Sequence, residues 1–380
     1  MILPNTKSRV FLIILVTSFF LVIAGSISFY LLTSKPKIQE SSQRSSAQEN
    51  KKAQKIPKAT LAAEQLTQFK DTTNKYNLDD IQGTPNKSLF PDITNPNFLV
   101  VSKETNIQDS DIVASFHVGD DYRAYPLKYI LFHHIVNDKF GKKPVLISFC
   151  GICNSAAAYN STLDGETLSF GVLGVLYLNN LVTYDRNSDS WWTQITGEAI
   201  SGKYKGKKLT LLPGMELIKF SDFKKTHPKG KVLQPIAQYA SSYELYNPNQ
   251  FYETEPESQS RDQVVGIEIR EKSRAYKITD VREEKIINES LNGWSLLIVS
   301  SPNDGGVRIF RRFIEENERI LDFELKDGNL VDKQTNSTWN FNGEATKGEL
   351  KGTTLDKPKY LELYLFAWKD FYPKTLLYKP

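Results

Sequence analysis

Both cysteines of the chain lie in one short segment, Cys150-Gly-Ile-Cys153, between two apolar runs. Two thiols separated by two residues have the spacing of a metal-binding turn or of a redox pair. A metal site needs further ligands, and sulfur with imidazole suits copper, zinc or iron. The side chains that could complete such a site are nitrogen and oxygen donors, namely His133, His134, His227, Asp138 and Asp185.

The same pair of cysteines permits other interpretations. It could shuttle between dithiol and disulfide, with a reactivity set by how nearby groups stabilise the thiolate. It could form a structural disulfide, although so small a ring stabilises at the low end of about 0 to 5 kcal/mol. A Cys150 thiolate with His133 could also serve a hydrolase. The cysteines could finally be incidental to a module that binds a ligand or a partner. The residue types favour metal binding and leave redox chemistry and binding open.

The two adjacent histidines belong to a predicted helix that begins at Pro126, a residue that suits the start of a helix. Leu127, Ile130 and Leu131 share one face with His134, so we expect His134 to be a core residue. His133 projects elsewhere on that helix and is the better candidate for a ligand or an acid-base group.

The chain also repeats itself. RAYPL at 123–127 recurs as RAYKI at 274–278, an offset of 151 residues, and a Gly-Glu-Ala motif recurs further along. We therefore predict two copies of one module, at 112–233 and 264–378, joined by an exposed linker at 234–263. Features shared by the copies are predicted to serve the fold, and features of one copy alone are candidates for function.

The chemistry-bearing residues are confined to the first copy. Cys150 and Cys153 stand opposite Ser301 and Asp304, and the three candidate histidines stand opposite non-histidine residues. The counterpart of the cysteine segment is Ser-Pro-Asn-Asp-Gly-Gly, a strong turn signal, and an alternating strand pattern follows it. The cysteines are thus predicted to lie in a turn between two strands. Trp191, which has Thr338 opposite it, is a further candidate for lining the site.

The N-terminus predicts the location of these residues. Residues 10–32 are uncharged and long enough to cross a membrane as a helix, and Lys7 and Arg9 precede them. The positive-inside bias keeps residues 1–9 in the cytoplasm and sends the rest out. We predict a single-pass signal anchor in the cell membrane, a polar disordered tether at 33–75, and both cysteines outside the cytoplasm.

Composition narrows the class further. The 380 residues carry a net charge of +4, with 40% hydrophobic and 24% charged residues, as is ordinary for globular domains. No dense stripe of Lys and Arg lies beside aromatic residues, so we predict no nucleic-acid partner. The fold class expected is α+β and strand-rich: two tandem repeats of one mixed module of β-meander and helix, preceded by a single transmembrane helix.

These segments resemble the family called domain of unknown function 3179. The resemblance rests on RAYPL, HHIVND, SFCGICNSA, LSFGV, LVTYDRNSDSWWTQITGEAISG and FKKTHP. It covers 112–233 closely and the second copy more loosely. The family pattern has His-Glu where this chain has His133-His134, and Cys-Pro-Leu-Cys where it has Cys150-Gly-Ile-Cys153. The resemblance implies no established activity.

Overall fold

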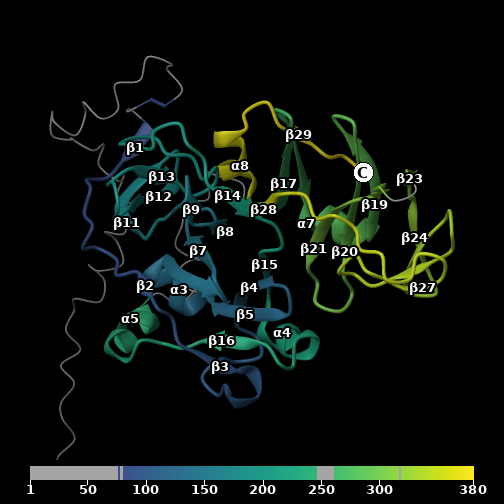
Figure 1. Ribbon diagram of the computed structural model, residues 1–380, viewed down its shortest axis with the longest axis horizontal. Helices are drawn as coiled ribbons and strands as arrows, with labels where there is room; N and C mark the ends of the chain where they lie inside the picture. The colour runs from purple at the N-terminus through teal and green to yellow at the C-terminus, as the bar shows by residue number, and fades with distance from the viewer. Residues whose placement is uncertain (1–75, 78–79, 246–260, 316–317) are drawn as a thin grey trace, which may run out of the picture. The chain divides into compact units, whose positions relative to one another are not determined.

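The structure, a computed structural model, describes residues 76–77, 80–245, 261–315 and 318–380 (Figure 1). These residues all belong to one compact unit. The predicted cytoplasmic N-terminus, anchor and tether lie outside them. Within the described part of the chain, no helix is both long and apolar enough to span a bilayer.

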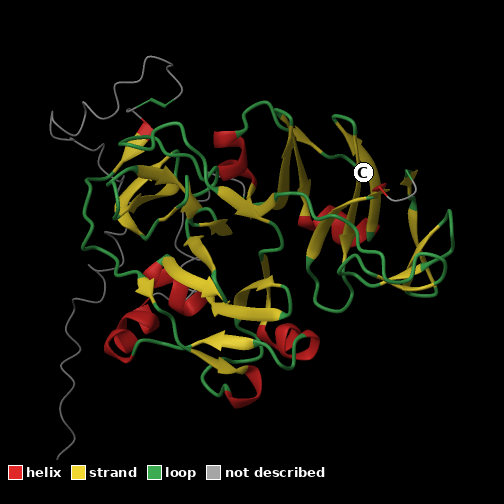
Figure 2. Ribbon diagram, viewed as in Figure 1, coloured by secondary structure: helices red, strands yellow, loops and turns green. Residues whose placement is uncertain are grey.

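Strands dominate the described residues, and the helices are short (Figure 2). The predicted strand-rich architecture is therefore confirmed. The strand that leads to the cysteines shows why the sequence adopts it: Val145-Leu-Ile-Ser-Phe is rich in residues that favour extended backbone and is buried throughout. A strand buried on both faces reads as a continuous apolar run, because neighbouring elements cover each face.

The first half of the fold is built on three sheets. Their strand orders are β14-β8-β7-β6-β2, β15-β4-β5-β16-β3 and β1-β11-β12-β13, and β9 and β10 form a separate hairpin. The strands are β1 Ile81–Gln82, β2 Ile93–Thr94, β3 Phe98–Val100, β4 Ile112–Val118, β5 Asp121–Pro126, β6 Ile135–Phe140, β7 Lys143–Cys150, β8 Ser155–Asn160, β9 Thr162–Leu163, β10 Glu166–Thr167, β11 Phe170–Tyr177, β12 Asn180–Asp185, β13 Trp191–Thr193, β14 Thr210–Leu212, β15 Glu216–Lys219 and β16 Lys231–Leu233.

The second half again has three main sheets, with strand orders β28-β17-β18-β29, β19-β20-β21 and β24-β25-β26-β27, and a hairpin of β22 and β23. The strands are β17 Gln263–Ile269, β18 Lys272–Lys277, β19 Ile286–Leu291, β20 Trp294–Ser300, β21 Val307–Arg311, β22 Phe313–Ile314, β23 Arg319–Ile320, β24 Phe323–Lys326, β25 Asn329–Asp332, β26 Thr338–Trp339, β27 Ala345–Lys347, β28 Tyr360–Tyr364 and β29 Leu376–Leu377.

The helices connect these strands. They are η2 Val101–Lys103, α3 Leu127–His133, α4 Phe220–Thr226, η3 Ala237–Tyr239, α5 Ala240–Leu245, α7 Ile278–Glu284 and α8 Leu365–Phe371. The helix predicted to begin at Pro126 is confirmed as α3. The predicted linker differs from expectation in its first part, since α5 packs against α3 and buries Tyr243. Residues 246–260 of that linker lie outside the described residues.

Corresponding positions of the two halves make the same contacts. In the first half, the Tyr125 hydroxyl donates to Asp138 at 2.6 Å; in the second, the Tyr276 hydroxyl donates to Glu289 at the same distance. The two residues of each pair are 13 positions apart in the sequence, and their hydrogen bond joins the strand before a short helix to the strand after it. Asp138 therefore holds the fold together rather than facing the cysteines.

A second contact recurs further along the chain. Asp185 accepts a hydrogen bond from Trp192 Nε1 at 2.9 Å, and Asp332 accepts one from Trp339 Nε1 at 3.0 Å. All four side chains are buried. Asp185 is thus occupied in the fold, as its counterpart is. The duplication itself stays a prediction, and these recurring contacts support it.

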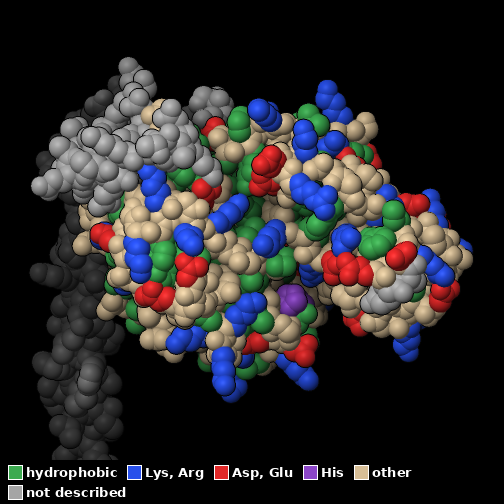
Figure 3. Space-filling view, turned by 45° about the horizontal axis from the view of Figure 1, so that its top comes forward, with side chains coloured by type: hydrophobic (Ala, Val, Ile, Leu, Met, Phe, Trp, Pro, Cys, Tyr) green, Lys and Arg blue, Asp and Glu red, His purple; other side chains and the backbone are tan. Residues whose placement is uncertain are grey.

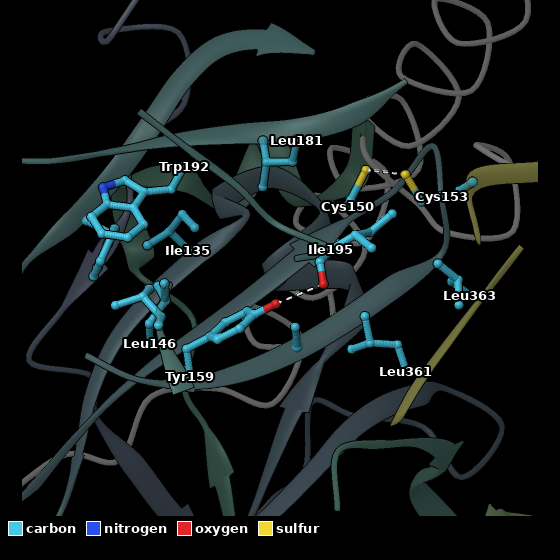
Figure 4. Packing of buried hydrophobic residues seen from close by; sticks show 14 of the residues in the cluster. Ile135, Leu146, Cys150, Cys153, Tyr159, Leu181, Trp192, Ile195, Leu361 and Leu363 are labelled. Carbon is cyan, nitrogen blue, oxygen red and sulfur yellow. Dashed lines mark hydrogen bonds between the residues drawn. The ribbon is translucent and has the colours of Figure 1, made fainter. Parts of the chain in front are cut away.

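The two halves share one hydrophobic core. Leu361 and Leu363 of β28 pack in the same cluster as Tyr159 of β8, Ile195 and the cysteines (Figure 4). The backbone joins the halves at this place too, because the Tyr364 N–H donates to the Cys153 carbonyl at 2.9 Å. The second half therefore forms part of the environment of the cysteine segment.

Candidate functional site

The cysteines lie in the turn between β7 and β8, as predicted. Cys150 ends β7 and pairs with Ser155 at the start of β8, and the turn closes through Asn154, which has a φ of 48°. The two sulfur atoms are 3.0 Å apart (Figure 4). Cys150 is 2% exposed and Cys153 is fully buried. The turn therefore presents two free thiols to each other inside the protein.

The two thiols differ in acidity. Burial alone would raise the pKa of Cys150, but the Cys153 thiol and the backbone N–H groups of Cys153, Leu181 and Ile152 act against it and lower the pKa overall. Burial and the neighbouring Cys150 sulfur raise the pKa of Cys153. Amide donors favour a thiolate as they favour other anions. Cys150 is thus the sulfur that ionises first and the nucleophile of the pair.

A polar network that the sequence analysis missed lies beneath Cys153. The Asn180 amide donates to Cys153 Sγ at 3.3 Å and to the Gln194 side-chain oxygen at 2.9 Å. The Ser155 hydroxyl donates to the same Gln194 oxygen at 2.8 Å. All three side chains are buried. Comparison of the two copies could have identified Gln194 as a candidate, because the position opposite it in the second copy is Phe341, so the polar side chain is present in the first copy alone.

His134 lies beside the cysteine turn. It caps α3 with a φ of 59°, and its Nδ1 lies 3.0 Å from the carbonyl of Phe149, the residue that precedes Cys150. Burial lowers the pKa of His134 to about 4, so the ring is neutral at neutral pH and donates from Nδ1 to that carbonyl. Nε2 is then an acceptor that can take a proton or bind a metal.

His133 points away from the cysteines. Its Nδ1 lies against the Pro91 carbonyl, and its Nε2 lies 2.8 Å from the Tyr243 hydroxyl of α5. The side chain is fully buried, and burial lowers its pKa. Both ring nitrogens thus have partners within the fold. His133 acts as a link between α3 and α5.

His227 lies elsewhere again, at the end of α4. Its ring stacks on Tyr122 at a centroid distance of 3.8 Å, and His117 also stacks on Tyr122, at 4.5 Å. Burial lowers the pKa of His227 to about 4. Trp191, the aromatic candidate for lining the site, is buried in the cluster that contains Val182.

Cys150 and His134 line one partly open cavity of about 250 Å³. Its walls come from β1, α3, the cysteine turn, β11 and β12. The register of β11 shifts between Val172 and Leu176, a bulge of the kind that often lies next to active sites. The cavity gives the Cys150 sulfur a path to small molecules.

The five predicted metal ligands do not form one site. The structure brings Cys150, Cys153 and His134 together and places His133 and His227 apart from them. In the part of the chain that the structure describes, no group of three or more His, Cys, Asp and Glu side chains is arranged to hold a metal ion.

The fold and the site define a strand-rich protein with a buried pair of adjacent thiols at the wall of an apolar cavity. The family model described as "Protein of unknown function (DUF3179)" matches residues 87–375, so the chain belongs to this family. Neither a curated protein nor a solved structure matches the chain.

Proposed function

We propose that the chain is a thiol-disulfide redox protein whose reactive pair is Cys150 and Cys153. The observation that carries this proposal is the 3.0 Å separation of the two sulfurs, in a turn whose amides surround the Cys150 sulfur. A disulfide bond is about 2.05 Å long, so the sulfurs need to approach by about 1 Å to form it. Two thiolates on a tetrahedral zinc, each at about 2.3 Å, lie about 3.8 Å apart, so metal binding needs the sulfurs to separate by about 0.8 Å. The two movements are similar in size, and the amides that favour a Cys150 thiolate support the exchange.

The exchange follows from the acidity of the two thiols. The Cys150 thiolate attacks one sulfur of a substrate disulfide, forms a mixed disulfide and expels the other sulfur as a thiolate. Cys153 then gives its proton to the thiolate that has just been released and attacks the Cys150 sulfur. The second substrate thiolate leaves and takes a proton. The substrate gains two electrons and two protons, and the cysteine pair loses them.

The test is the reduction potential of the pair. The purified chain is equilibrated in glutathione redox buffers, with dithiothreitol buffers for the most reducing potentials, and free thiols are counted by mass spectrometry after alkylation. A reversible disulfide with a potential between about −270 and −120 mV, the range of redox catalysts, is expected. A potential below about −300 mV indicates a structural disulfide, and failure to form the bond overturns the proposal.

A second function rests on His134, which lines the same cavity as Cys150. Two sulfurs and one imidazole nitrogen could hold a single copper, zinc or iron ion, with the fourth position open or filled from solvent, once these side chains had moved closer together, because the described residues contain no preformed metal site. Elemental analysis of the chain purified without added metal tests this. About one ion per chain, lost in the Cys150→Ser/Cys153→Ser variant but kept in His133→Gln and His227→Gln, would favour metal binding over redox exchange.

We place both functions outside the cytoplasm, on the cell membrane to which residues 10–32 would anchor the chain as a single-pass protein. The apolar length of this segment and the preceding Lys7 and Arg9 support this location. Disulfides form and persist there, so a dithiol-disulfide pair would have oxidants and disulfides to exchange with. Protease accessibility of intact cells, compared with cells made permeable, tests the location.

A further inference from the structure

The cavity at Cys150 differs in character from the protein surface. On the face shown in Figure 3, Lys and Arg are interspersed with Asp and Glu. Of the side chains around the cavity, only Gln82, His134 and Cys150 carry polar atoms, and the rest are apolar or glycine. The apolar walls include Phe90, Leu131, Val172, Val175, Leu176 and Leu181. A charged group placed there would lose its hydration without compensation, whereas an apolar group would gain from burial.

The size of the cavity limits what can enter. Its volume of about 250 Å³ is below the range of about 300 to 1,000 Å³ of pockets that hold drug-sized ligands. An occupant of this size is a short alkyl or aryl group, such as a small organic thiol carries.

Burial of the sulfurs excludes a large partner. Cys150 is 2% exposed and Cys153 is fully buried, so the cystine of a folded protein cannot reach either sulfur without displacing the turn. A small molecule that enters the cavity can reach Cys150 directly. One residue joins the two features, since the Leu181 side chain lines the cavity and its backbone N–H donates to the Cys150 sulfur.

We infer that the substrate of the Cys150–Cys153 pair is a small organic disulfide with apolar substituents, taken up in the cavity lined by Leu131, Val172 and Leu176. This inference rests on the redox function proposed above. In the reaction, the Cys150 thiolate attacks the substrate disulfide and releases one organic thiol. Cys153 then attacks the Cys150 sulfur and releases the second thiol, so that the substrate disulfide is reduced to two thiols while the Cys150–Cys153 dithiol is oxidised to a disulfide.

The experiment compares three oxidants on the fully reduced chain: diethyl disulfide, the dicationic cystamine, and insulin as a protein disulfide. Each rate of intramolecular disulfide formation is divided by the rate of the same oxidant with free dithiothreitol. We expect the normalised rate with diethyl disulfide to exceed the normalised rate with each of the other oxidants by at least about tenfold, which corresponds to about 1.4 kcal/mol. A Leu176→Glu variant should lose this preference, and Leu376→Gln, at an exposed position, should keep it.

The outcomes separate the two levels of the argument. Equal normalised rates for diethyl disulfide and cystamine, or a faster reaction with insulin, overturn the substrate class and leave the redox function standing. Failure of all three oxidants and of oxidised dithiothreitol to form the disulfide overturns both. If Leu176→Glu fails to fold, the milder Leu176→Gln replaces it, because this half-buried position tolerates a side chain of similar length. An unchanged preference in the folded variant shows that the cavity does not select the substrate.

Discussion

Replacing Arg308 by methionine should destabilise the protein more than the loss of any exposed ion pair would. Arg308 lies on β21 of the second half and is bound on two sides. Its Nε and Nη2 donate to the two Glu216 carboxylate oxygens, at 2.7 and 2.6 Å, and it also bonds Asp304 at 2.7 Å. The side-chain exposures are 4% for Arg308, 11% for Glu216 and 6% for Asp304. Methionine preserves the apolar length of the side chain but removes the cation to which both buried carboxylates are hydrogen-bonded.

The expected loss is about 3 to 5 kcal/mol in the free energy of unfolding, as measured for breaking other buried ion pairs. The matched control is Arg319→Met. Arg319 pairs with Glu349 at 2.7 Å, but the two side chains are 44% and 57% exposed, so the loss there should be below about 1 kcal/mol. Urea unfolding followed by tryptophan fluorescence measures both variants. Equal losses in the two variants would refute the reasoning.

Two further measurements test whether uncompensated charge is the cause. The triple variant Arg308→Met/Glu216→Gln/Asp304→Asn should be more stable than Arg308→Met alone, because it leaves neither carboxylate of the pair buried as an anion. In the wild type, burial raises the pKa of Asp304 but Arg308 lowers it more, so its net pKa lies below 3.8. The stability from Asp304 is thus present above about pH 3.8 and is lost as the pH falls through the folded pKa. Arg308→Met should lack this acid-dependent loss.

The remaining predictions concern a close contact and a titration. Gly197→Ala should destabilise the protein more than Gly206→Ala in urea unfolding. Both glycines have positive φ, but only at Gly197 would a Cβ overlap the Tyr159 ring. His134, whose pKa burial lowers from 6.5 to about 4, should make stability fall by up to about 3 kcal/mol between those pH values. The loss occurs as the pH falls, and His227, whose pKa burial also lowers to about 4, contributes in the same range. His134→Asn, which tolerates the positive φ and does not titrate, should reduce the loss without removing it, and an unchanged pH profile would contradict the assignment.

The sequence predicts the local features of the site well. The turn between β7 and β8 and the start of α3 are confirmed, because turn residues and Pro126 act through the backbone within a few positions. The structure places the two adjacent histidines the other way round from the prediction, again for a local reason: His133 is bound within the fold and His134 lines the cavity. The helix ends at His133, and the positive φ of His134 turns that side chain off the helical face, so helical periodicity no longer gives its direction.

The parts of the site that depend on distant segments could not be predicted. His133 is bound by Tyr243 from a segment read as exposed linker, 110 residues away. Cys153 rests on Asn180, 27 residues further along, through a network that hydrophobic patterns do not reveal. The predicted metal site assumed that histidines of one copy converge. Topology instead distributes them, since His227 follows a different sheet.

The turn that holds the thiols and the corresponding turn of the second half, at 301–306, serve different purposes. The first turn presents Cys150 and Cys153, and the second uses Asp304 to fix Arg308 against Glu216 of the first half. Because the Tyr364 N–H of the second half also binds the Cys153 carbonyl, the shape of the cysteine turn depends on how firmly the halves are joined. The ion pair at Arg308 and this hydrogen bond thus join the two halves at two places.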